Sequence, residues 1–304
     1  MRKTAILLIF IFLCAAFLSG CGGKGKRNER IVLLNGQFSE ITILMQMAGL
    51  LIEKNTNLKV VFHDSMNTVA ASQAVRSKGV DVYVSYDGTL LTTILGNDPS
   101  DVPEGENLFE WTKAKAEREI GLTLLEKFGF QNTYALAVKQ EFAQKHNIKT
   151  ISDLVPFAQY LVFGAEHEFF DLTGTMRFRP FNRRYGIEWR DGRSLEMGLK
   201  YAAIDSGNID VTMVYSTDGL NKKSNLYILE DNLSFFPEYN AAFMFRTTLF
   251  EEYKETAPNL KEVLSLLNGQ IDNETMIALN YAVDAEGARP RDVARQFLIE
   301  IGLL

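Results

Sequence analysis

The sequence contains very little cysteine. Cys14 and Cys21 are its only two cysteines in 304 residues, and Cys14 lies inside an apolar N-terminal run. If that run is removed as a signal, Cys21 alone remains, so the mature chain can form no internal disulfide and no cysteine-based metal site. The three histidines, His63, His146 and His167, do not have the spacing of a zinc site. We therefore expect neither a structural disulfide nor a bound metal.

Motifs for nucleotide and ester chemistry are also missing. The chain has no glycine-rich phosphate loop followed by lysine, no Gly-x-Gly-x-x-Gly and no Gly-x-Ser-x-Gly elbow. The formal net charge is −6, which argues against a general affinity for nucleic acid. One acid/base cluster is present, Glu166-His167-Glu168. It leaves an extracytoplasmic hydrolase as an alternative function, although a solvated strand end is its simpler interpretation. No cofactor is expected.

The N-terminus has the pattern of a targeting segment. Arg2 and Lys3 precede an apolar run over residues 4–18, and Leu18-Ser19-Gly20-Cys21 resembles a bacterial lipobox. We therefore expect residues 1–20 to be a lipoprotein signal peptide, Cys21 to carry lipid and residues 21–30 to be a flexible tether. An uncleaved anchor is the alternative, although the run is short for a spanning helix. Either interpretation places the body of the protein outside the cytoplasm, attached to the membrane.

The first third of the chain alternates between strands and helices. Strands are predicted at residues 31–34, 58–62 and 80–84, and helices at 40–54 (with Ser39 as N-cap), 67–78 and 111–128. Asp87-Gly88 is expected to turn the chain sharply after the third strand, ahead of a short helix over 90–95. This βαβαβ order favours a largely parallel sheet with helices on both faces. Further strands are predicted at 132–138, 161–165, 209–214, 226–229 and 241–245, and helices at 195–204, 248–253, 260–267, 273–281 and 290–301, with loop and short helix over 171–192.

One phrase occurs twice along the chain. Val80-Asp81-Val82 leads to Tyr86, and Ile209-Asp210-Val211 leads to Tyr215, with the same spacing. In open α/β sheets, ligands bind beyond the carboxyl ends of the strands, which is where both tyrosines stand. The repeat therefore predicts two similar lobes that offer Tyr86 and Tyr215 to a shared cleft. Two ordinary strands with aromatic ends are the alternative.

Tyrosine is abundant at the ends of the predicted elements. Tyr86, Tyr134, Tyr215 and Tyr239 each lie next to an Asn, Thr, Asp or Pro residue of a turn. Four converging tyrosines would form an aromatic box. Such a box suits a quaternary ammonium ion, which has no N–H to donate, and one desolvated cation–π contact contributes about 2 kcal/mol.

Four motifs together resemble one protein family. They are Asn132-Thr133-Tyr134-Ala135-Leu136, Tyr215-Ser216-Thr217-Asp218-Gly219, Phe235-Phe236-Pro237-Glu238-Tyr239 and Asn280-Tyr281-Ala282-Val283-Asp284. The family is that of the substrate-binding lipoproteins of osmoprotectant ABC transporters, which take up glycine betaine, choline, carnitine and related compounds. The similarity extends over about residues 31–304. It implies a small quaternary ammonium ligand, a permease and its ATPase as partners, and no catalysis.

The resemblance also implies a fold and a binding site. The fold is the α/β type II periplasmic-binding-protein fold, with a ligand cleft between two lobes. Lobe 1 would comprise residues 31–132 and 240–304, and lobe 2 residues 133–239. The family's tyrosine cage corresponds to Tyr86, Tyr134, Tyr215 and Tyr239, and Thr89 and Asn132 match polar positions beside the cage.

The chain departs from the family where relatives hold a carboxylate. A family Lys is replaced by Gly36, a Gln by Ile41, and an Arg by Asp171 or Leu172, while Asp87 follows the first cage tyrosine in place of Thr. An unpaired buried carboxylate is costly. We therefore expect choline-like ligands to bind better than glycine betaine, with Asp87 favouring a hydroxyl-bearing cation if it faces the cleft.

Other outcomes remain open at this stage. An arginine of the basic run Arg177, Arg179, Arg183 and Arg184 could replace the missing arginine. The ligand could be another small cation or an amino acid. A surface sensor or adhesin that kept the fold is a third class.

Overall fold

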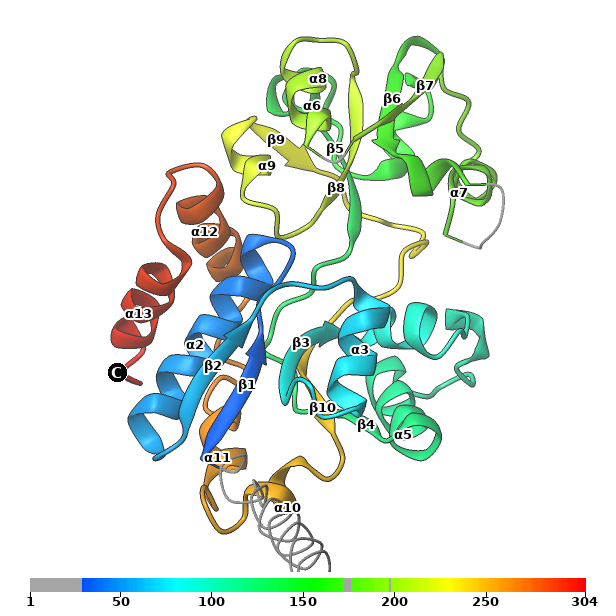
Figure 1. The fold of residues 1–304 in the computed structure, drawn as a ribbon. Coiled ribbons are helices and arrows are strands. Elements are labelled where there is room, and N and C mark those ends of the chain that lie inside the picture. Colours follow the sequence, from blue (N-terminus) through cyan, green and yellow to red (C-terminus); the bar gives the residue numbers. More distant parts are fainter. Residues whose placement is uncertain (1–28, 172–175, 197) are drawn as a thin grey trace, which may run out of the picture.

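A computed structural model describes residues 29–171, 176–196 and 198–304 of the chain. The predicted signal peptide, Cys21, most of the tether and Leu172 lie outside the described residues. The chain forms two α/β units, each built on its own five-stranded sheet (Figure 1). Among the described residues, no helix is long and apolar enough to cross a membrane.

The two sheets have equivalent topology. The first has the order β2-β1-β3-β10-β4 and the second the order β7-β6-β8-β5-β9. In the first, β1 is parallel to β2 and β3, whereas β10 is antiparallel to β3 and β4. In the second, β6 is parallel to β7 and β8, whereas β5 is antiparallel to β8 and β9. Each sheet is therefore mixed, and the expectation of a largely parallel sheet was wrong.

The strands of the first sheet are β1 Arg30–Leu34, β2 Lys59–His63, β3 Val82–Tyr86, β4 Leu122–Leu124 and β10 Ala241–Arg246. Those of the second are β5 Tyr134–Lys139, β6 Val162–Glu166, β7 Asp191–Leu195, β8 Val211–Tyr215 and β9 Leu226–Ile228. The repeated phrase thus supplies the middle strands, β3 and β8, of the two sheets.

The aspartate of the repeat has the same structural role in both sheets. One carboxylate oxygen of Asp81 accepts a hydrogen bond from the backbone N–H of Val32 at 2.8 Å, and Asp210 accepts one from Val162 at 2.8 Å. In return, the backbone N–H groups of Asp81 and Asp210 donate to the carbonyls of Val32 and Val162. Each aspartate therefore ties its strand to the neighbouring parallel strand.

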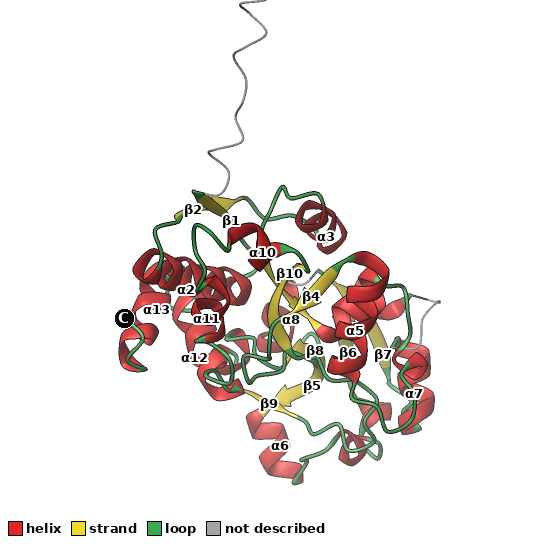
Figure 2. Ribbon diagram, turned by 90° about the horizontal axis from the view of Figure 1, so that it is seen from below, coloured by secondary structure: helices red, strands yellow, loops and turns green. Residues whose placement is uncertain are grey.

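Helices surround both sheets. They are α2 Ser39–Asn55, α3 Thr68–Arg76, α4 Asp87–Thr89, α5 Leu108–Ile120, α6 Gln140–His146, α7 Phe178–Tyr185, α8 Leu199–Asp205, α9 Leu220–Lys223, α10 Leu249–Tyr253, α11 Leu260–Ser265, α12 Asn273–Asp284 and α13 Pro290–Glu300. In Figure 2, α2, α11, α12 and α13 gather on one flank of the first sheet, and α3 and α5 lie on the other. Helix α2 is buried along most of its length because it packs against α11, α12 and α13.

Three local predictions were wrong. The helix expected over 111–128 ends at Ile120, because Gly121 adopts a left-handed conformation (φ 68°) and β4 follows. Phe38, not Ser39, occupies the N-cap of α2, and the Ser39 hydroxyl instead donates to Asp284. Asp87-Gly88, where a sharp turn had been expected, instead continues from β3 into α4, and the short helix expected over 90–95 is present as a π-helical turn over Leu90–Ile94.

Strand β7 was not predicted. Helix α7 lies within the stretch 171–192 that had been assigned to loop and short helix, whereas strand β7 begins in that stretch, ends at Leu195 and forms the edge of the second sheet. Helix α8 consequently begins at Leu199, four residues after its predicted start. The weak apolar pattern of Asp191-Gly-Arg-Ser-Leu195 explains the omission, since edge strands bury little surface.

Two crossover segments connect the sheets and run side by side. Gln131 pairs with Asn240 in an isolated antiparallel bridge, and the backbone N–H of Asn132 donates to the carbonyl of Tyr239 at 3.0 Å. Strands β5 to β9 all belong to the second sheet, and β10 returns to the first. The lobe boundaries at residues 132/133 and 239/240 stay a prediction.

Candidate ligand-binding site

A cavity of about 480 Å³ lies between the two sheets. This volume is within the usual range for small-molecule sites. Both α/β units contribute to its walls. The first contributes α2, β3 and the helical turn after β3, and the second contributes the strand ends and loops of β5 and β8. Of the residues predicted for the site, the cavity is lined by Ile41, Tyr86, Thr89, Asn132, Tyr134, Tyr215 and Tyr239.

Three of the predicted tyrosines form one aromatic cluster. Tyr134 and Tyr215 have ring centroids 5.2 Å apart, and the ring of Tyr239 stands edge-on to Tyr134 at 6.3 Å. Tyr134 begins β5 and Tyr215 ends β8, so antiparallel pairing brings them opposite each other. Burial raises the pKa of the Tyr134, Tyr215 and Tyr239 phenols, so all three are neutral at physiological pH. The cluster therefore presents uncharged π faces to the cavity.

Gly88 allows Tyr239 to reach its position. A Cβ atom at Gly88 would lie 2.6 Å from the Tyr239 ring, which is closer than real contacts permit. Any larger residue would push that ring away from the wall. The Asp87-Gly88 pair predicted as a turn thus has a packing function beside the cavity.

Tyr86 lines the same cavity, but its hydroxyl contacts a carboxylate. It donates to Oε1 of Glu40, which also accepts a hydrogen bond from Nδ2 of Asn132 at 3.0 Å. The other oxygen, Oε2, accepts from the hydroxyl of Thr217 and from Nδ2 of Asn280 at 3.0 Å. Glu40 thereby joins five segments of the chain at one point.

The environment of Glu40 is unusual for a carboxylate. The side chain is only 2% exposed. Burial raises its pKa above the ordinary 4.5, while the hydrogen bonds from Thr217, Tyr86, Asn280 and Asn132 oppose that shift. Glu40 was not predicted as a site residue. It lies between Gly36 and Ile41, in a segment that was compared with the family only at the positions where this chain differs.

The ionisable lining of the cavity is acidic. Apart from tyrosines, the ionisable residues that line it are Glu40, Asp218 and Asp284, and no lysine, arginine or histidine of the described residues does so. Burial raises the pKa of Asp284, and its hydrogen bond from Ser39 opposes the shift. A cavity lined by one sign of charge favours ligands of the opposite sign. The lining therefore suits a cation.

Asp87 and Gly36 do not line the cavity. Asp87 is fully buried, and its carboxylate accepts hydrogen bonds from the backbone N–H and the side-chain Nδ2 of Asn240, both at 2.8 Å. Its burial raises the pKa to about 6. The condition under which Asp87 was expected to favour a hydroxyl-bearing cation, that its side chain faces the cleft, is therefore not met in this structure. Gly36 packs against the side chain of Ile41, which does line the cavity.

None of the four arginines of the basic run is among the described residues that line the cavity. Arg177 is half-buried, and its Nη1 donates to the carbonyl of Met176 at 3.0 Å. Arg184 donates to the carbonyl of Leu233. Neither these two nor Arg179 and Arg183 line the cavity, so the positions proposed to replace a carboxylate-binding arginine lie elsewhere.

The cluster Glu166-His167-Glu168 also lies apart from the cavity. Glu166 is paired with Lys200 at 2.6 Å, whereas the His167 ring contacts Ser194 and, at 3.3 Å, Glu196. The side chain of His167 is 62% exposed. Glu166 and His167 therefore have different partners, and no residue of the triplet lines this cavity.

Comparison with known proteins identifies the family. Residues 29–300 match the family model described as the substrate-binding domain of ABC-type glycine betaine transport systems. A solved structure described as a glycine betaine/carnitine/choline ABC transporter has a TM-score of 0.81 and 28% identity, covering 90% of this chain and 98% of that chain. Apo YehZ from Escherichia coli has a TM-score of 0.73 at 20% identity, covering 90% and 99%.

Two curated relatives are 31% identical. The carnitine transport binding protein OpuCC of Listeria monocytogenes matches over 295 residues, 96% of this chain and 93% of that protein. The ergothioneine transport permease/ergothioneine binding protein EgtU of Helicobacter pylori matches over 299 residues, 98% of this chain. The chain spans about half, 52%, of the length of EgtU. The predicted type II periplasmic-binding-protein fold is confirmed, and the chain belongs to the family of substrate-binding domains of ABC-type glycine betaine transport systems.

Proposed function

We propose that this protein captures a quaternary ammonium compound in a cage formed by Tyr134, Tyr215 and Tyr239, with Tyr86 on the facing wall, and delivers it to an ABC permease. One observation carries the proposal. The rings of Tyr134, Tyr215 and Tyr239 cluster with centroid distances of 5.2 and 6.3 Å on the wall of a cavity whose charged lining groups are acids. The names of the relatives, which include carnitine and glycine betaine binding, support the same ligand class.

The physical reason lies in the ammonium group. A trimethylammonium group has no N–H and cannot use carboxylates through hydrogen bonds, so ring faces and a negative field are the interactions left to it. The tyrosine cluster supplies the faces, and the acidic lining of the cavity supplies the negative field. Catalysis is not part of the proposal.

The lining also favours a net cation over a zwitterion. A ligand carboxylate would lie among Glu40, Asp218 and Asp284 with no described lysine or arginine to pair with it. We therefore propose that choline-like ligands bind more tightly than glycine betaine. The acidic lining alone is the basis of this preference, since Asp87 does not line the cavity.

Calorimetry with four small ligands tests the proposal. We expect binding of choline and tetramethylammonium, weaker binding of glycine betaine, and little binding of 3,3-dimethylbutan-1-ol, which has the shape of choline without its charge. Equal binding of choline and its neutral analogue would contradict a cation site. Glycine betaine binding as tightly as choline would contradict the preference and would make Arg177 the next residue to substitute. A screen of amino acids and other small cations covers the alternative ligands.

We further propose that Cys21 anchors the protein in the membrane through lipid, next to the permease and its ATPase. The motivation is the lipobox-like stretch Leu18-Ser19-Gly20-Cys21 after an apolar run. Stable anchoring generally needs more than one acyl chain. Mass spectrometry of the native protein should find a lipidated N-terminal Cys21, and Cys21→Ser should release the protein from membranes. An N-terminus that retains Met1 without lipid would contradict the anchor.

A further inference from the structure

A lysine is buried directly behind the aromatic cluster. Lys200, in α8, is 0% exposed, and its Nζ lies 2.6 Å from Oε1 of Glu166 at the end of β6. The same Nζ lies over two aromatic rings, 4.7 Å from the centroid of Tyr215 and 5.4 Å from that of Tyr201. Lysine is almost never fully buried unless it is paired. This ammonium group is therefore itself held in a small box of two rings and one carboxylate.

The position of Lys200 relative to the cavity is informative. Tyr201 and Tyr215 line the cavity, but Lys200 does not. The ammonium group thus packs against the Tyr215 ring from outside the cavity lining, and the part of the ring that it covers is closed to a ligand. A cation bound against Tyr215 from the cavity would share one ring with an internal cation.

The equivalent lobe shows that the fold does not require this ion pair. In the second sheet, Glu166 stands four residues after Val162, and Lys200 stands ten residues before Asp210. In the first sheet, the positions with the same spacing from Val32 and Asp81 are Gly36 and Ala71. The first lobe thus forms the same topology with two small, uncharged residues. A buried ion pair is weak evidence for stability in any case, since desolvation offsets its attraction.

We propose that the Lys200–Glu166 pair positions Tyr215 and sets how strongly the cage discriminates a cation from a neutral molecule; this rests on the proposed tyrosine cage. The Lys200 ammonium group packs against one face of the Tyr215 ring and repels a ligand cation bound against the other face. The negative charge of Glu166 offsets this repulsion. The pair is a specificity-determining element that does not touch the ligand.

Removing the charge of Lys200 and removing the charge of Glu166 should shift the ratio of the two ligand affinities in opposite directions. In Lys200→Met, the unbalanced Glu166 should raise the ratio of choline affinity to 3,3-dimethylbutan-1-ol affinity, by about tenfold for charges on opposite sides of one ring. In Glu166→Gln, the unbalanced ammonium should lower that ratio by a similar factor. Lys200→Arg keeps the charge and should keep the ratio near that of the unmodified protein. Loss of packing alone would weaken both ligands by the same factor and leave the ratio unchanged.

The experiment uses the full mature chain and both ligands in parallel titrations. Because a buried charge without its partner tends to neutralise, Lys200→Met is measured up to about pH 9 and Glu166→Gln down to about pH 6. Lys200→Gln, which can still donate to Glu166, provides the same test if Lys200→Met does not fold. Lys139→Met, which breaks an ion pair with Asp205 outside the cavity lining, is the matched control and should leave the ratio unchanged.

Equal shifts for both ligands in the Lys200 and Glu166 variants, or shifts of the same sign in the two variants, would overturn this inference while leaving the cage intact. Failure of the unmodified protein to bind choline would instead overturn the proposed function, so the two failures are distinguishable.

Discussion

Tyr134 and Tyr215 are directly paired across the antiparallel strands β5 and β8, and their ring centroids lie 5.2 Å apart. Residues opposite each other in such a pair project to the same face of the sheet. The first residue of β5 and the last residue of β8 are therefore neighbours, and their rings lie side by side at the same end of the sheet. A one-residue shift of register would move one of the two rings to the opposite face of the sheet.

This pairing leads to a prediction for the aromatic cluster. Tyr215→Ala or Tyr239→Ala should weaken choline binding tenfold or more, because one desolvated ring contact contributes about 2 kcal/mol. The corresponding Phe variants should lose less, since the ring face remains. Calorimetry on the four variants measures the effect. Unchanged affinity in both Ala variants would remove these residues from the site.

A second prediction concerns the buried carboxylate of Glu40. In Glu40→Gln, one of the two acceptor oxygens becomes an NH₂ group facing donors that now lack a partner, such as Thr217 and Asn280. We expect the free energy of unfolding to fall by about 1–3 kcal/mol. Choline affinity should also fall because the cavity loses a negative charge. Glu53→Gln, an exposed position on the same helix, serves as the control for denaturant unfolding and calorimetry. Equal behaviour of the two variants would show that the Glu40 network is dispensable.

A third prediction follows from the raised pKa of Asp87, about 6 against an ordinary 3.8. The folded protein binds this proton more tightly than the unfolded chain does, so the contribution is fully present below about pH 4 and is lost as pH rises through 6. A shift of about two pKa units corresponds to about 3 kcal/mol of unfolding free energy. The Asp87→Asn variant cannot bind this proton, so its unfolding free energy should lack this pH-dependent contribution.

Denaturant titrations between about pH 3.5 and 6.5 compare the two proteins. The stability of the unmodified protein relative to Asp87→Asn should increase as the pH is lowered, by an amount of the order of 3 kcal/mol. The exposed control Asp64→Asn should follow the unmodified protein. A difference that does not vary with pH would exclude Asp87 as the titrating group.

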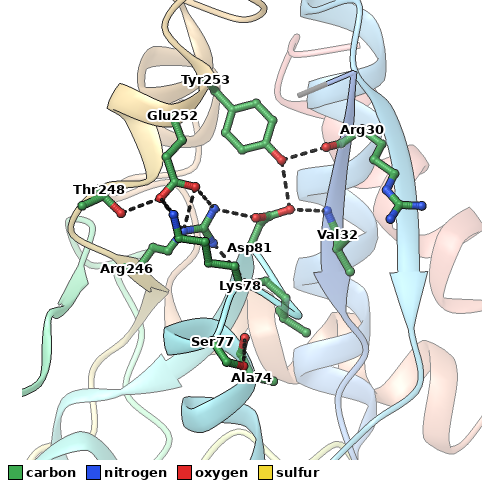
Figure 3. Close-up of polar contacts among 11 residues, drawn as sticks. Arg30, Val32, Ala74, Ser77, Lys78, Asp81, Arg246, Thr248, Glu252 and Tyr253 are labelled. Atoms are coloured by element: carbon green, nitrogen blue, oxygen red, sulfur yellow. Dashed lines mark hydrogen bonds and ion pairs between the residues drawn. The ribbon is translucent and has the colours of Figure 1, made fainter. Parts of the chain in front are cut away.

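A fourth prediction concerns the polar cluster at the end of the first sheet where β3 begins and β10 ends (Figure 3). Nη2 of the buried Arg246 lies 2.8 Å from Asp81 and 2.7 Å from Glu252, and the hydroxyl of Tyr253 donates to Asp81 at 3.0 Å. Arg246→Met leaves the Asp81 carboxylate buried without its cation. We expect a loss of about 3–5 kcal/mol of unfolding free energy.

Lys78→Met is the matched control for that cluster. The Lys78–Glu252 ion pair has a distance of 2.8 Å, but the Lys78 side chain is 47% exposed. Its removal should therefore change the unfolding free energy by at most about 1 kcal/mol. Similar losses in the two variants would contradict the assignment of Arg246 as the partner that the buried carboxylate requires.

A fifth prediction concerns motion between the lobes, with the segments near 132–135 and 236–241 as hinges. A ligand that contacts both lobes shifts the population toward the closed form. Small-angle scattering with saturating choline should show a smaller radius of gyration, and Tyr215→Ala at the same concentration should show less compaction. A radius that does not change when calorimetry confirms saturation would contradict hinge closure.

Local sequence patterns were enough to locate most strands and helices and to single out four tyrosines that line the cavity, whereas the fold itself was expected from the resemblance to a family. Tyr86 and Tyr215 follow short apolar strands, and the repeated Asp-Val phrase marks both strands as copies of one element. Strand ends and turns depend on neighbours in the chain, so they leave a local signal. Where that signal is weak, as in β4 and β7, the prediction failed.

Contacts between distant residues were decided by the tertiary structure alone. Glu40 meets Thr217 and Asn280 only because the two lobes and α12 converge there, and no spacing in the sequence indicates it. The direction of Asp87 depends on Asn240, which approaches from the returning crossover. Lys200 finds Glu166 and the Tyr215 ring across three different elements. Such partners are selected by burial, because a buried polar group must find whichever complementary group the folded chain brings within reach.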